Sequence, residues 1–327
     1  MCSGAQGMQL NQACEKFFKG YFSTNERTKK TKAAYLSDLT QFNVFAGEDL
    51  ALKAMSGALI ERWCAHLRQH GYSPTSIRRK MVVLRVFCNY WVRKGSLRES
   101  PFWRVQLSYG RVEQLPKALS LREMRKLLLQ ARRRNSSVLA ALKEEEASLR
   151  VSSPGYRSLR NLALVDLLFA TGMRVGEVSS LNVQDFLTGE SVFRVKGKGG
   201  RDRLAVMVDE ETVRVQRQYL EVRGRIETRS PALFLNSSGG RLTTQGIANV
   251  ITQLREGAGI ERHVTPHMLR HTVATLLLRN GADIRIVQEF LGHASIATTQ
   301  RYTHVTKEHL IGVLRKRHPS IGMRGKT

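Results

Sequence analysis

The amino-acid sequence predicts a two-domain protein that is mainly α-helical and carries one small antiparallel β-sheet. Apolar residues recur at helical spacing through most of the 327 residues, which predicts amphipathic helices. Residues 191–208 instead alternate on both sides of a Gly-Lys-Gly-Gly turn, which indicates a β-hairpin. Residues 100–117 have neither period and contain two prolines and a glycine, which is typical of a linker. We therefore expect a first domain at 1–107, a linker at 108–117 and a second domain at 118–327.

The charge of the chain is strongly positive. Lysine and arginine together number 53 against 27 aspartates and glutamates, which gives a formal net charge of +26 and an isoelectric point near 10.6. A protein needs a much smaller charge, of either sign, to stay in solution. An excess of this size therefore favours a polyanionic partner, and nucleic acid is the commonest one.

Cysteine usage and apolar runs give an expectation about the compartment. Cys2, Cys14, Cys64 and Cys88 lie in the first third of the chain without a C-x-x-C pair. This spacing favours neither zinc nor a disulfide framework, and it fits a reducing compartment. The first residues lack the apolar stretch of a secretion signal, and the longest apolar runs, such as 162–170, are far too short to span a membrane. We expect a cytoplasmic protein without a membrane segment.

Four helices are predicted in the first domain, near residues 9–24, 26–47, 57–69 and 73–95. The apolar stripe of the last helix consists of Ile77, Met81, Leu84, Phe87, Cys88 and Trp91. Two of the helices begin with clusters of basic residues. The alternative to a binding role is a solvated charged face, but we expect these clusters to meet DNA phosphates. The predicted contacts are Lys29, Lys30 and Lys32 in one helix and Arg78, Arg79 and Lys80 in the other.

The second domain opens with a capping box, in which Ser120 precedes Glu123 by three residues. The segment 132–157 then separates this helix from the next. We expect it to carry a helix at 138–149 that is either a surface helix or a contact for a partner, rather than part of the active site. Further helices are predicted near 158–170, 210–224 and 243–256. The start of the last of these is a further predicted DNA contact, formed by Thr243, Thr244 and Gln245.

The stretch 263–304 gathers polar residues beyond what packing requires. Thr265 and Pro266 are typical of the N-cap and first position of a helix. His267 and Arg270 follow three residues apart and so share a helix face. A second short helix ends at Gly292, and the histidine and tyrosine that follow it are His293 and Tyr302.

Three sequence motifs closely resemble those of the tyrosine recombinase (phage-integrase, Xer-type) family. They are TPHMLRHT, LGHASIATTQRYTH and, far upstream, ATGMRVGEV. The first domain also resembles the family's helical core-binding (SAM-like) domain through Thr31, Tyr35, Asp38, Leu39 and Phe42. The resemblance covers nearly the whole chain. It implies a catalytic set of Arg174, Lys198, His267, Arg270, His293 and Tyr302, with Glu177 and His271 in supporting roles.

This set fits metal-free cleavage of a phosphodiester. Arg174 and Arg270 supply planar forks that match a phosphate and stay charged near neutral pH. Tyr302 is the expected nucleophile, and its 3′-phosphotyrosyl product conserves the bond energy for rejoining. Lys198, at the hairpin tip, is the expected donor of a proton to the leaving 5′-oxygen. His267 is expected to act in proton transfer, and His293 to hydrogen-bond the phosphate. Glu177 orients the histidines or supports the fold near Arg174, and His271 is expected to be mainly structural, facing a neighbouring helix.

Metal chemistry is the main chemical alternative. His267 and His271 have the spacing of a zincin helix, but Met268 stands where such a helix carries glutamate. A two-metal nuclease needs clustered carboxylates, and Asp283 and Glu289 are the acidic residues of this region. We therefore expect neither a metal nor another cofactor. A type IB topoisomerase and a catalytically idle DNA-binding protein are the other function classes left open.

The resemblance also implies partners. We expect a double-stranded DNA recombination site, a homotetramer or a heterotetramer with a related recombinase on DNA, and association with the nucleoid. The role is either integration and excision of a mobile element or Xer-type dimer resolution. Apolar residues at helical spacing predict a last helix within 303–320. Family members pack such a helix on a neighbouring protomer, and the alternative is that it folds back on its own domain.

Overall fold

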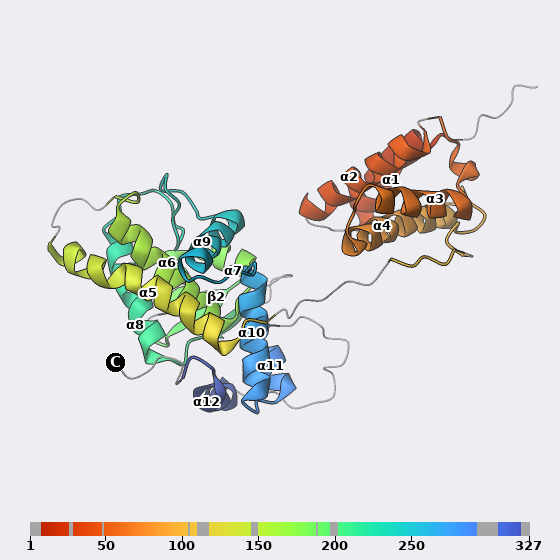
Figure 1. Cartoon of the computed structure of the whole chain (residues 1–327). Coiled ribbons are helices and arrows are strands. Elements are labelled where there is room, and N and C mark those ends of the chain that lie inside the picture. Colours follow the sequence, from red (N-terminus) through yellow and green to blue (C-terminus); the bar gives the residue numbers. More distant parts are fainter. Residues whose placement is uncertain are drawn as a thin grey trace, which may run out of the picture. The chain divides into compact units, whose positions relative to one another are not determined.

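A computed structural model of the chain describes residues 8–25, 29–47, 49–103, 105–109, 118–144, 150–187, 189–196, 202–292 and 307–321. The chain divides into two compact units, residues 1–114 (unit 1) and 115–327 (unit 2), which are described separately (Figure 1). Within the described residues the fold is mainly helical with one small antiparallel sheet, which confirms the predicted fold class.

Unit 1 is a helical bundle formed by α1 (Leu10–Thr24), α2 (Lys29–Ala46), α3 (Gly57–Gln69) and α4 (Pro74–Arg93), with a short 3-10 turn at Leu52–Ala54. Side-chain caps set two of the helix starts. The Ser56 hydroxyl accepts from the Leu59 amide at the start of α3, and the Ser73 hydroxyl accepts from the Ser76 amide at the start of α4. These helices match the predicted ranges to within a few residues.

Aromatic residues fill the core of unit 1. Phe17, Phe42 and Phe87 are almost completely buried, and the rings of Phe17 and Phe87 pack edge to face with their centroids 5.3 Å apart. The predicted apolar stripe of α4 is buried along its whole length, as the helical period requires. The opposite side of α4 carries the exposed Arg78 and Arg79.

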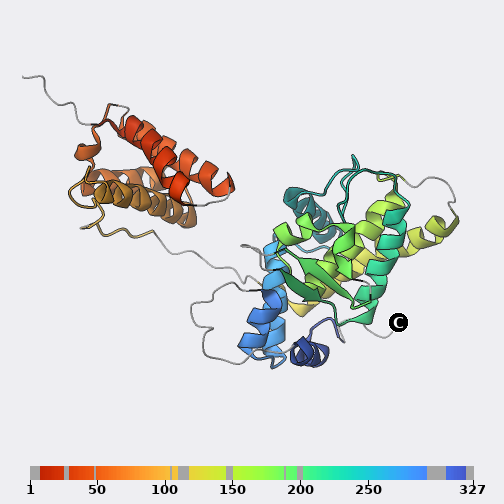
Figure 2. The ribbon, with the colours of Figure 1, turned by 180° about the vertical axis from the view of Figure 1, so that it is seen from behind.

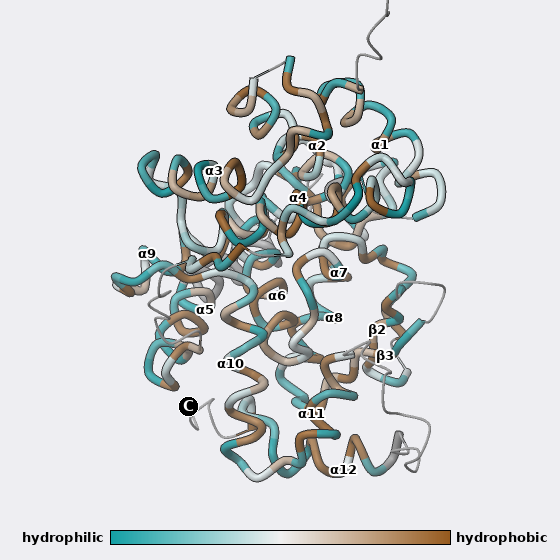
Figure 3. Tube along the Cα trace, turned by 90° about the vertical axis from the view of Figure 1, so that its right-hand side faces the viewer, coloured by the Kyte–Doolittle hydropathy of each residue, from teal (hydrophilic) through white to brown (hydrophobic). Residues whose placement is uncertain are grey.

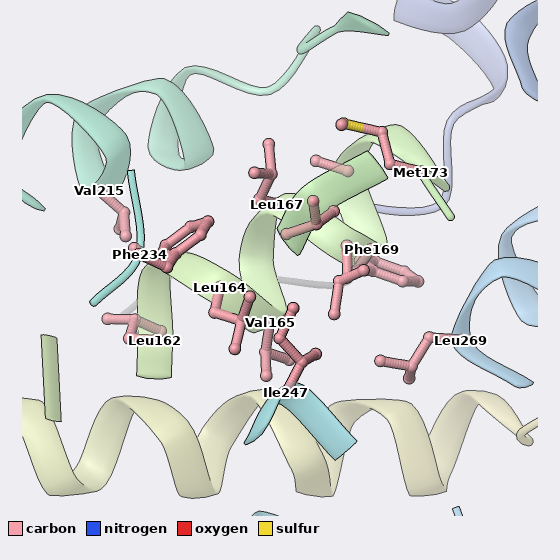
Figure 4. Close-up of a cluster of buried hydrophobic side chains, with 14 of the residues drawn as sticks. Leu162, Leu164, Val165, Leu167, Phe169, Met173, Val215, Phe234, Ile247 and Leu269 are labelled. Atoms are coloured by element: carbon pink, nitrogen blue, oxygen red, sulfur yellow. The ribbon is translucent and has the colours of Figure 1, made fainter. Parts of the chain in front are cut away.

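Unit 2 is built around one buried helix, α6 (Pro154–Thr171), which packs mainly against α5, α8 and α10. The helices of unit 2 are α5 (Leu121–Glu144), α6, α7 (Val175–Ser180), α8 (Glu210–Gly224), α9 (Thr244–Gly257), α10 (Pro266–Arg279), α11 (Ile284–Leu291) and α12 (Lys307–Arg317), with a 3-10 turn at Val183–Asp185. Residues 162–171 of α6 are all buried, and their side chains meet residues from α8, α9 and α10 (Figure 4).

The mostly apolar character of residues 162–171 of α6 reflects this central position, and hydrophobic colouring is prominent around the α6 label in Figure 3. A helix that is apolar on every side is buried in the core of a protein or in a membrane. Among the residues that the structure describes, no helix combines the length and the apolar character needed to cross a bilayer. The partners of α6 are instead the helices α5, α8 and α10 and the strand β3.

The sheet of unit 2 has three antiparallel strands in the order β1 (Phe186–Leu187), β2 (Val192–Val195) and β3 (Arg203–Val206) (Figure 2). The predicted hairpin at 191–208 is therefore confirmed, and it gains the short strand β1 at one edge. Val195 pairs with Arg203 as the last pair before the hairpin tip. Residues 197–201 of the tip, including Lys198, lie outside the described residues.

The segment after the capping box differs from the prediction. The capping box itself is present, because the Ser120 amide donates to Glu123 Oε2 at 2.7 Å and the Glu123 amide donates to Ser120 Oγ at 3.2 Å. Residues 138–144 are helical as predicted, but they continue α5 rather than form a separate helix, and residues 145–149 lie outside the described residues. No glycine or proline interrupts 121–144, and the arginine-rich and alanine-rich turns extend the same helix.

The next helix begins earlier than predicted. α6 starts at Pro154 rather than near residue 158, because Ser153 caps it by accepting from the Tyr156 amide and Pro154 occupies the first helical position. A proline at this position needs no amide hydrogen and already has the helical φ angle. This Ser-Pro start signal explains the difference.

The last helix folds back on its own unit. α12 contacts α11, and Leu314 on α12 is fully buried. Asn280 Nδ2 donates to the carbonyl of Arg317 at 2.8 Å, and the rings of Phe290 and His318 pack edge to face. In this single chain the tail helix therefore packs on its own unit.

Candidate active site

The site is built where the end of α6 meets the end of α11. Gly172 ends α6 in the left-handed conformation, with φ of 56°. A Cβ atom added there would lie 2.5 Å from a methyl group of Leu291, so a larger residue would push α11 away. Glycine therefore allows both the sharp turn into α7 and the close approach of α11.

Arg174 stands at the N-cap of α7, directly after this turn. Its backbone amide donates to Glu177 Oε2 at 2.8 Å, and its Nη1 donates to Glu177 Oε1 at 2.9 Å. Its Nη2 donates to the carbonyl of Gly292 at 3.1 Å. The side chain is nevertheless 40% exposed, so part of its guanidinium can reach a ligand.

Arg270 lies on α10 and is only 8% exposed. Its Nη1 donates to the carbonyl of Gly172 at 2.7 Å, and its Nη2 donates to the carbonyl of Leu291 at 2.8 Å. Burial, followed by the repulsion of Arg174 and Arg203, lowers the pKa of Arg270 to about 10. The guanidinium therefore remains charged at neutral pH. A bound anion would stabilise this charge, because it would offset the burial and the repulsion of the neighbouring arginines.

Arg203 is a third arginine of the site, which the sequence analysis missed. It is the first residue of β3, and its Nη2 lies 2.9 Å from Glu177 Oε2. A strand period of two puts Arg203 on the same face as Ala205, which is 1% exposed. A charged residue on the inner face of a predicted strand, next to the hairpin tip, is the signal that could have identified Arg203.

Glu177 is the carboxylate that joins two of these arginines. Burial alone would raise its pKa, but the charge of Arg203 and the hydrogen bonds from Arg174 outweigh burial, and the pKa is lowered below its ordinary value. The carboxylate is therefore ionised across the neutral range. It holds Arg174 and Arg203 with its two oxygens and leaves the three-arginine cluster with a net positive charge.

The C-terminal end of α11 organises the same three arginines. The carbonyls of Phe290, Leu291 and Gly292 accept from Arg203, Arg270 and Arg174, in that order. The last carbonyls of a helix have no partner within the helix and carry partial negative charge. They hold the arginine forks in place, and the remaining donors of Arg174 and Arg270 can bind the oxygens of a tetrahedral anion such as a phosphate.

The predicted histidines of α10 are both on its surface. His267 lies in the first turn and is exposed, so it is free to meet a ligand. His271, one turn later, is also exposed, which corrects the expectation that it faces a neighbouring helix. The core side of this part of α10 is instead formed by Leu269, Arg270 and Val273.

Three members of the predicted catalytic set, Lys198, His293 and Tyr302, lie outside the described residues. In the sequence, His293 directly follows Gly292, and Lys198 lies between Val195 and Arg203.

The predicted DNA contacts of unit 1 differ in exposure. Lys29 and Lys32 are exposed on α2, and the side chain of Lys30 lies outside the described residues. Arg78 and Arg79 are exposed on α4. Lys80 is 4% exposed, and its Nζ donates to Asp38 Oδ1 at 2.9 Å and to Gln41 Oε1 at 2.7 Å.

The burial of Lys80 corrects its prediction as a phosphate contact. The residue points between α2 and α4, where Asp38 is also buried and binds Arg79 as well. An ammonium group in such a place needs a fixed carboxylate partner and is not available to DNA. The basic cluster at the start of α4 thus contains two exposed arginines and one internal lysine.

The predicted contact at the start of α9 is a helix N-terminus in unit 2. Thr243 is the N-cap and accepts from the Gly246 amide at 3.1 Å, while Gln245 is exposed and donates to Asn249. Across the described ranges, no group of three or more histidine, cysteine or acidic side chains is arranged to hold a metal ion.

Comparisons with known proteins agree with this description. The Phage integrase family matches residues 140–309, and the family described as Phage integrase, N-terminal SAM-like domain matches residues 14–95. The chain is 32% identical over 316 residues to the tyrosine recombinase XerC of Listeria innocua serovar 6a, covering 95% of this chain and 99% of that one. It is 33% identical over 318 residues to the tyrosine recombinase XerD of Listeria monocytogenes serovar 1/2a, with the same two coverages, 95% and 99%.

A solved structure shares the fold. A lambda integrase tetramer bound to a Holliday junction has a TM-score of 0.67 and 16% identity, covering 93% of this chain and 82% of that one. The family matches and the sequence relatives show that this chain belongs to the tyrosine recombinase (phage integrase) family.

Proposed function

We propose that this protein is a site-specific DNA recombinase that cleaves and rejoins DNA strands through a covalent 3′-phosphotyrosine intermediate. The observation that carries the proposal is the arginine cluster at the end of α11. Arg174 and Arg270 each use part of a guanidinium on helix-end carbonyls and keep further donors for a phosphate. Such preorganised donors stabilise a phosphoryl transition state more than the ground state, because the negative charge on its oxygens grows.

We assign the remaining steps to residues of the family motifs and of the hairpin tip. The hydroxyl of Tyr302 attacks the scissile phosphorus, and the bond from phosphorus to the 5′-oxygen breaks. His267, which is exposed on α10, takes part in the transfer of the tyrosine proton. Lys198 gives a proton to the leaving 5′-oxygen, and His293 hydrogen-bonds the phosphate. Rejoining is the reverse attack by a 5′-hydroxyl, so no ATP and no metal is needed.

The two domains divide the work. The domain at 1–107, joined by the linker at 108–117, binds the core of the recombination site, and the domain at 118–327 performs the chemistry. The DNA contacts are assigned to Lys29, Lys30, Lys32, Arg78, Arg79, Thr243, Thr244 and Gln245. Lys80 is not among them, because it is buried against Asp38. Its role is to hold the start of α4 on α2.

The related recombinases support a proposal for the oligomeric assembly on DNA. A lambda integrase is known as a tetramer on a Holliday junction, and an XerH recombinase is known bound to its difH substrate. We assign to this chain a tetramer on two duplex sites, formed with itself or with a related recombinase. Its place is the cytoplasm, on the nucleoid, and its role is either integration and excision of a mobile element or dimer resolution.

The test uses a pool of duplexes with randomised sequence and a nick that lets the cleaved fragment diffuse away. The full chain is incubated with the pool in EDTA, and protein–DNA adducts that survive SDS are isolated and sequenced. We expect adducts that converge on one site, because release of the fragment traps the phosphotyrosine.

Tyr302→Phe should bind the recovered site within a few-fold of the wild type and form no adduct. The proposed function is wrong if the wild-type chain yields no adduct on any duplex. The metal-free scheme is wrong if adducts form only when Mg²⁺ replaces EDTA.

A further inference from the structure

Arg203 occupies a central place in the site, although it lies in none of the three family motifs. Its Nη2 pairs with Glu177 Oε2 at 2.9 Å, and its Nη1 donates to the carbonyl of Phe290 at 3.4 Å. Its side chain is 19% exposed. Its Nε is buried and donates to no acceptor among the described residues. The guanidinium is therefore desolvated and incompletely used by the protein around it.

The backbone next to Arg203 is shaped to admit it. Gly292 has a φ of 66°, and a Cβ atom added there would lie 2.6 Å from both Cδ and Nε of Arg203. A side chain at this position would displace the arginine or the end of α11. The close contact joins β3 to the residue whose carbonyl binds Arg174.

The charge of Glu177 explains why a cation is useful here. Glu177 binds Arg174 through both the backbone amide and the side chain. A carboxylate paired with Arg174 alone would neutralise most of the charge that the arginine offers to a phosphate. Arg203 shares the same carboxylate from the other side, so Glu177 can fix Arg174 while the cluster stays cationic.

We propose that Arg203 is a positioning residue for the scissile phosphate: it balances the charge of Glu177, so that Arg174 is held in place and still available to the phosphate. This inference rests on the proposed strand cleavage. A purely structural role would be met more easily by an apolar residue, because a buried ion pair stabilises a fold little or not at all relative to apolar packing. Arg203 itself touches Glu177 and the end of α11, and it acts on the phosphate through Arg174.

The test compares two substrates with the duplex recovered from the random pool. One has a normal scissile phosphate, and the other has a methylphosphonate, in which a methyl group replaces a non-bridging oxygen and removes the charge. Arg203→Met should slow adduct formation about 10- to 100-fold on the normal phosphate, because Arg174 is no longer correctly available. On the methylphosphonate the loss should be about threefold or less, because there is no charge left to compensate.

Two further variants separate charge from shape. Arg203→Lys keeps the charge beside Glu177 but loses the planar fork, and it should recover most of the rate on the normal phosphate. Arg214→Met is the matched control. Like Arg203, Arg214 pairs with a glutamate, but its partner is Glu211, three residues away on the surface of α8, and its side chain is 66% exposed. It should behave as the wild type on both substrates.

The outcomes are distinct. Equal losses for Arg203→Met on both substrates, or a lysine variant as slow as the methionine variant, would overturn the charge-balancing role. Unchanged rates on both substrates would overturn it as well. Circular dichroism checks that each variant is folded, and the lysine variant keeps the test decisive if the methionine variant is not. Absence of any adduct with the wild-type chain would instead mean that the proposed function itself has failed.

Discussion

Arg270 shows how single residues of the site combine position with charge. A buried guanidinium is costly unless its donors are bound, and Arg270 binds the carbonyls of Gly172 and Leu291. These carbonyls belong to the ends of two helices, so the same bonds that satisfy the arginine also join α6 to α11. The lowered pKa, about 10, records the remaining cost of burial and of the neighbouring arginines. A bound phosphate would remove much of this cost.

Glu177 gives a prediction about acid stability. Its pKa is lowered in the folded protein from an ordinary value of 4.5, so its ionised form stabilises the fold above that pH. This contribution is lost as the pH falls through the lowered pKa. Glu177→Gln should therefore reduce the free energy of unfolding of unit 2 most at neutral pH. The difference in the free energy of unfolding should narrow below about pH 4. In that range the unfolded wild-type chain binds up to about one proton more than the folded chain does, because the pKa of Glu177 is lower in the folded state.

Urea unfolding from pH 7 to pH 3, followed by far-ultraviolet circular dichroism, measures this difference. Trp63, Trp91 and Trp103 all lie in unit 1, so tryptophan fluorescence serves as an internal control that should not change. A difference that stays constant over the whole pH range would show that the charge of Glu177 does not contribute.

Residue identity alone could predict part of the site. Arg174, His267 and Arg270 lie within recognisable sequence motifs and were predicted. Arg203 was missed because its role depends on Glu177 and on Phe290, which are distant in sequence and meet it only in the fold. Lys80 was assigned to the wrong environment because a sequence pattern cannot show that Asp38 faces it across the bundle.

At the level of elements, the C-terminal end of α11 is the part on which the site depends. Its last carbonyls bind three arginines that come from β3, α7 and α10. Periodicity and caps predicted α10 and α11 well, because Thr265, Pro266 and the glycines at 281 and 292 mark their ends. The continuation of α5 to Glu144 was not predicted. The weak helix formers in its middle do not stop the helix, because the segment contains neither glycine nor proline.

Helix α4 gives a prediction that separates a DNA contact from an internal lysine. Arg78 is exposed, and Arg78→Ala should reduce the dependence of log affinity on log salt by about one. Lys80→Met should leave this slope unchanged, because Lys80 is buried on Asp38. It should instead destabilise unit 1 by about 1–3 kcal/mol, since a buried carboxylate loses a partner.

Both quantities are accessible with the full chain. Binding of the recovered duplex between 50 and 200 mM salt gives the slope, and tryptophan fluorescence in urea gives the stability of unit 1. If Lys80→Met lowers the salt slope as much as Arg78→Ala does, the lysine reaches DNA and its burial here is not relevant to binding.

For the whole molecule, charge and family together define the protein. The net charge of +26 suits a partner that is itself a polyanion, and several exposed basic residues lie in unit 1 while the three-arginine cluster lies in unit 2. The presence of two helical domains and a small sheet followed from periodicity and from an aperiodic linker. The proposed catalytic set did not follow from periodicity, because its members lie far apart in the sequence and were assigned from the family resemblance.

The most direct test of the account is the chemical identity of the covalent adduct. The complex of the full chain with the recovered nicked duplex is digested with trypsin and nuclease, and the modified peptide is identified by mass spectrometry. We expect a nucleotide joined through its 3′-phosphate to the tryptic peptide that contains Tyr302, with the modification on the phenolic oxygen. A nucleotide attached to any other residue, or through a 5′-phosphate, would contradict the proposed use of the arginine cluster.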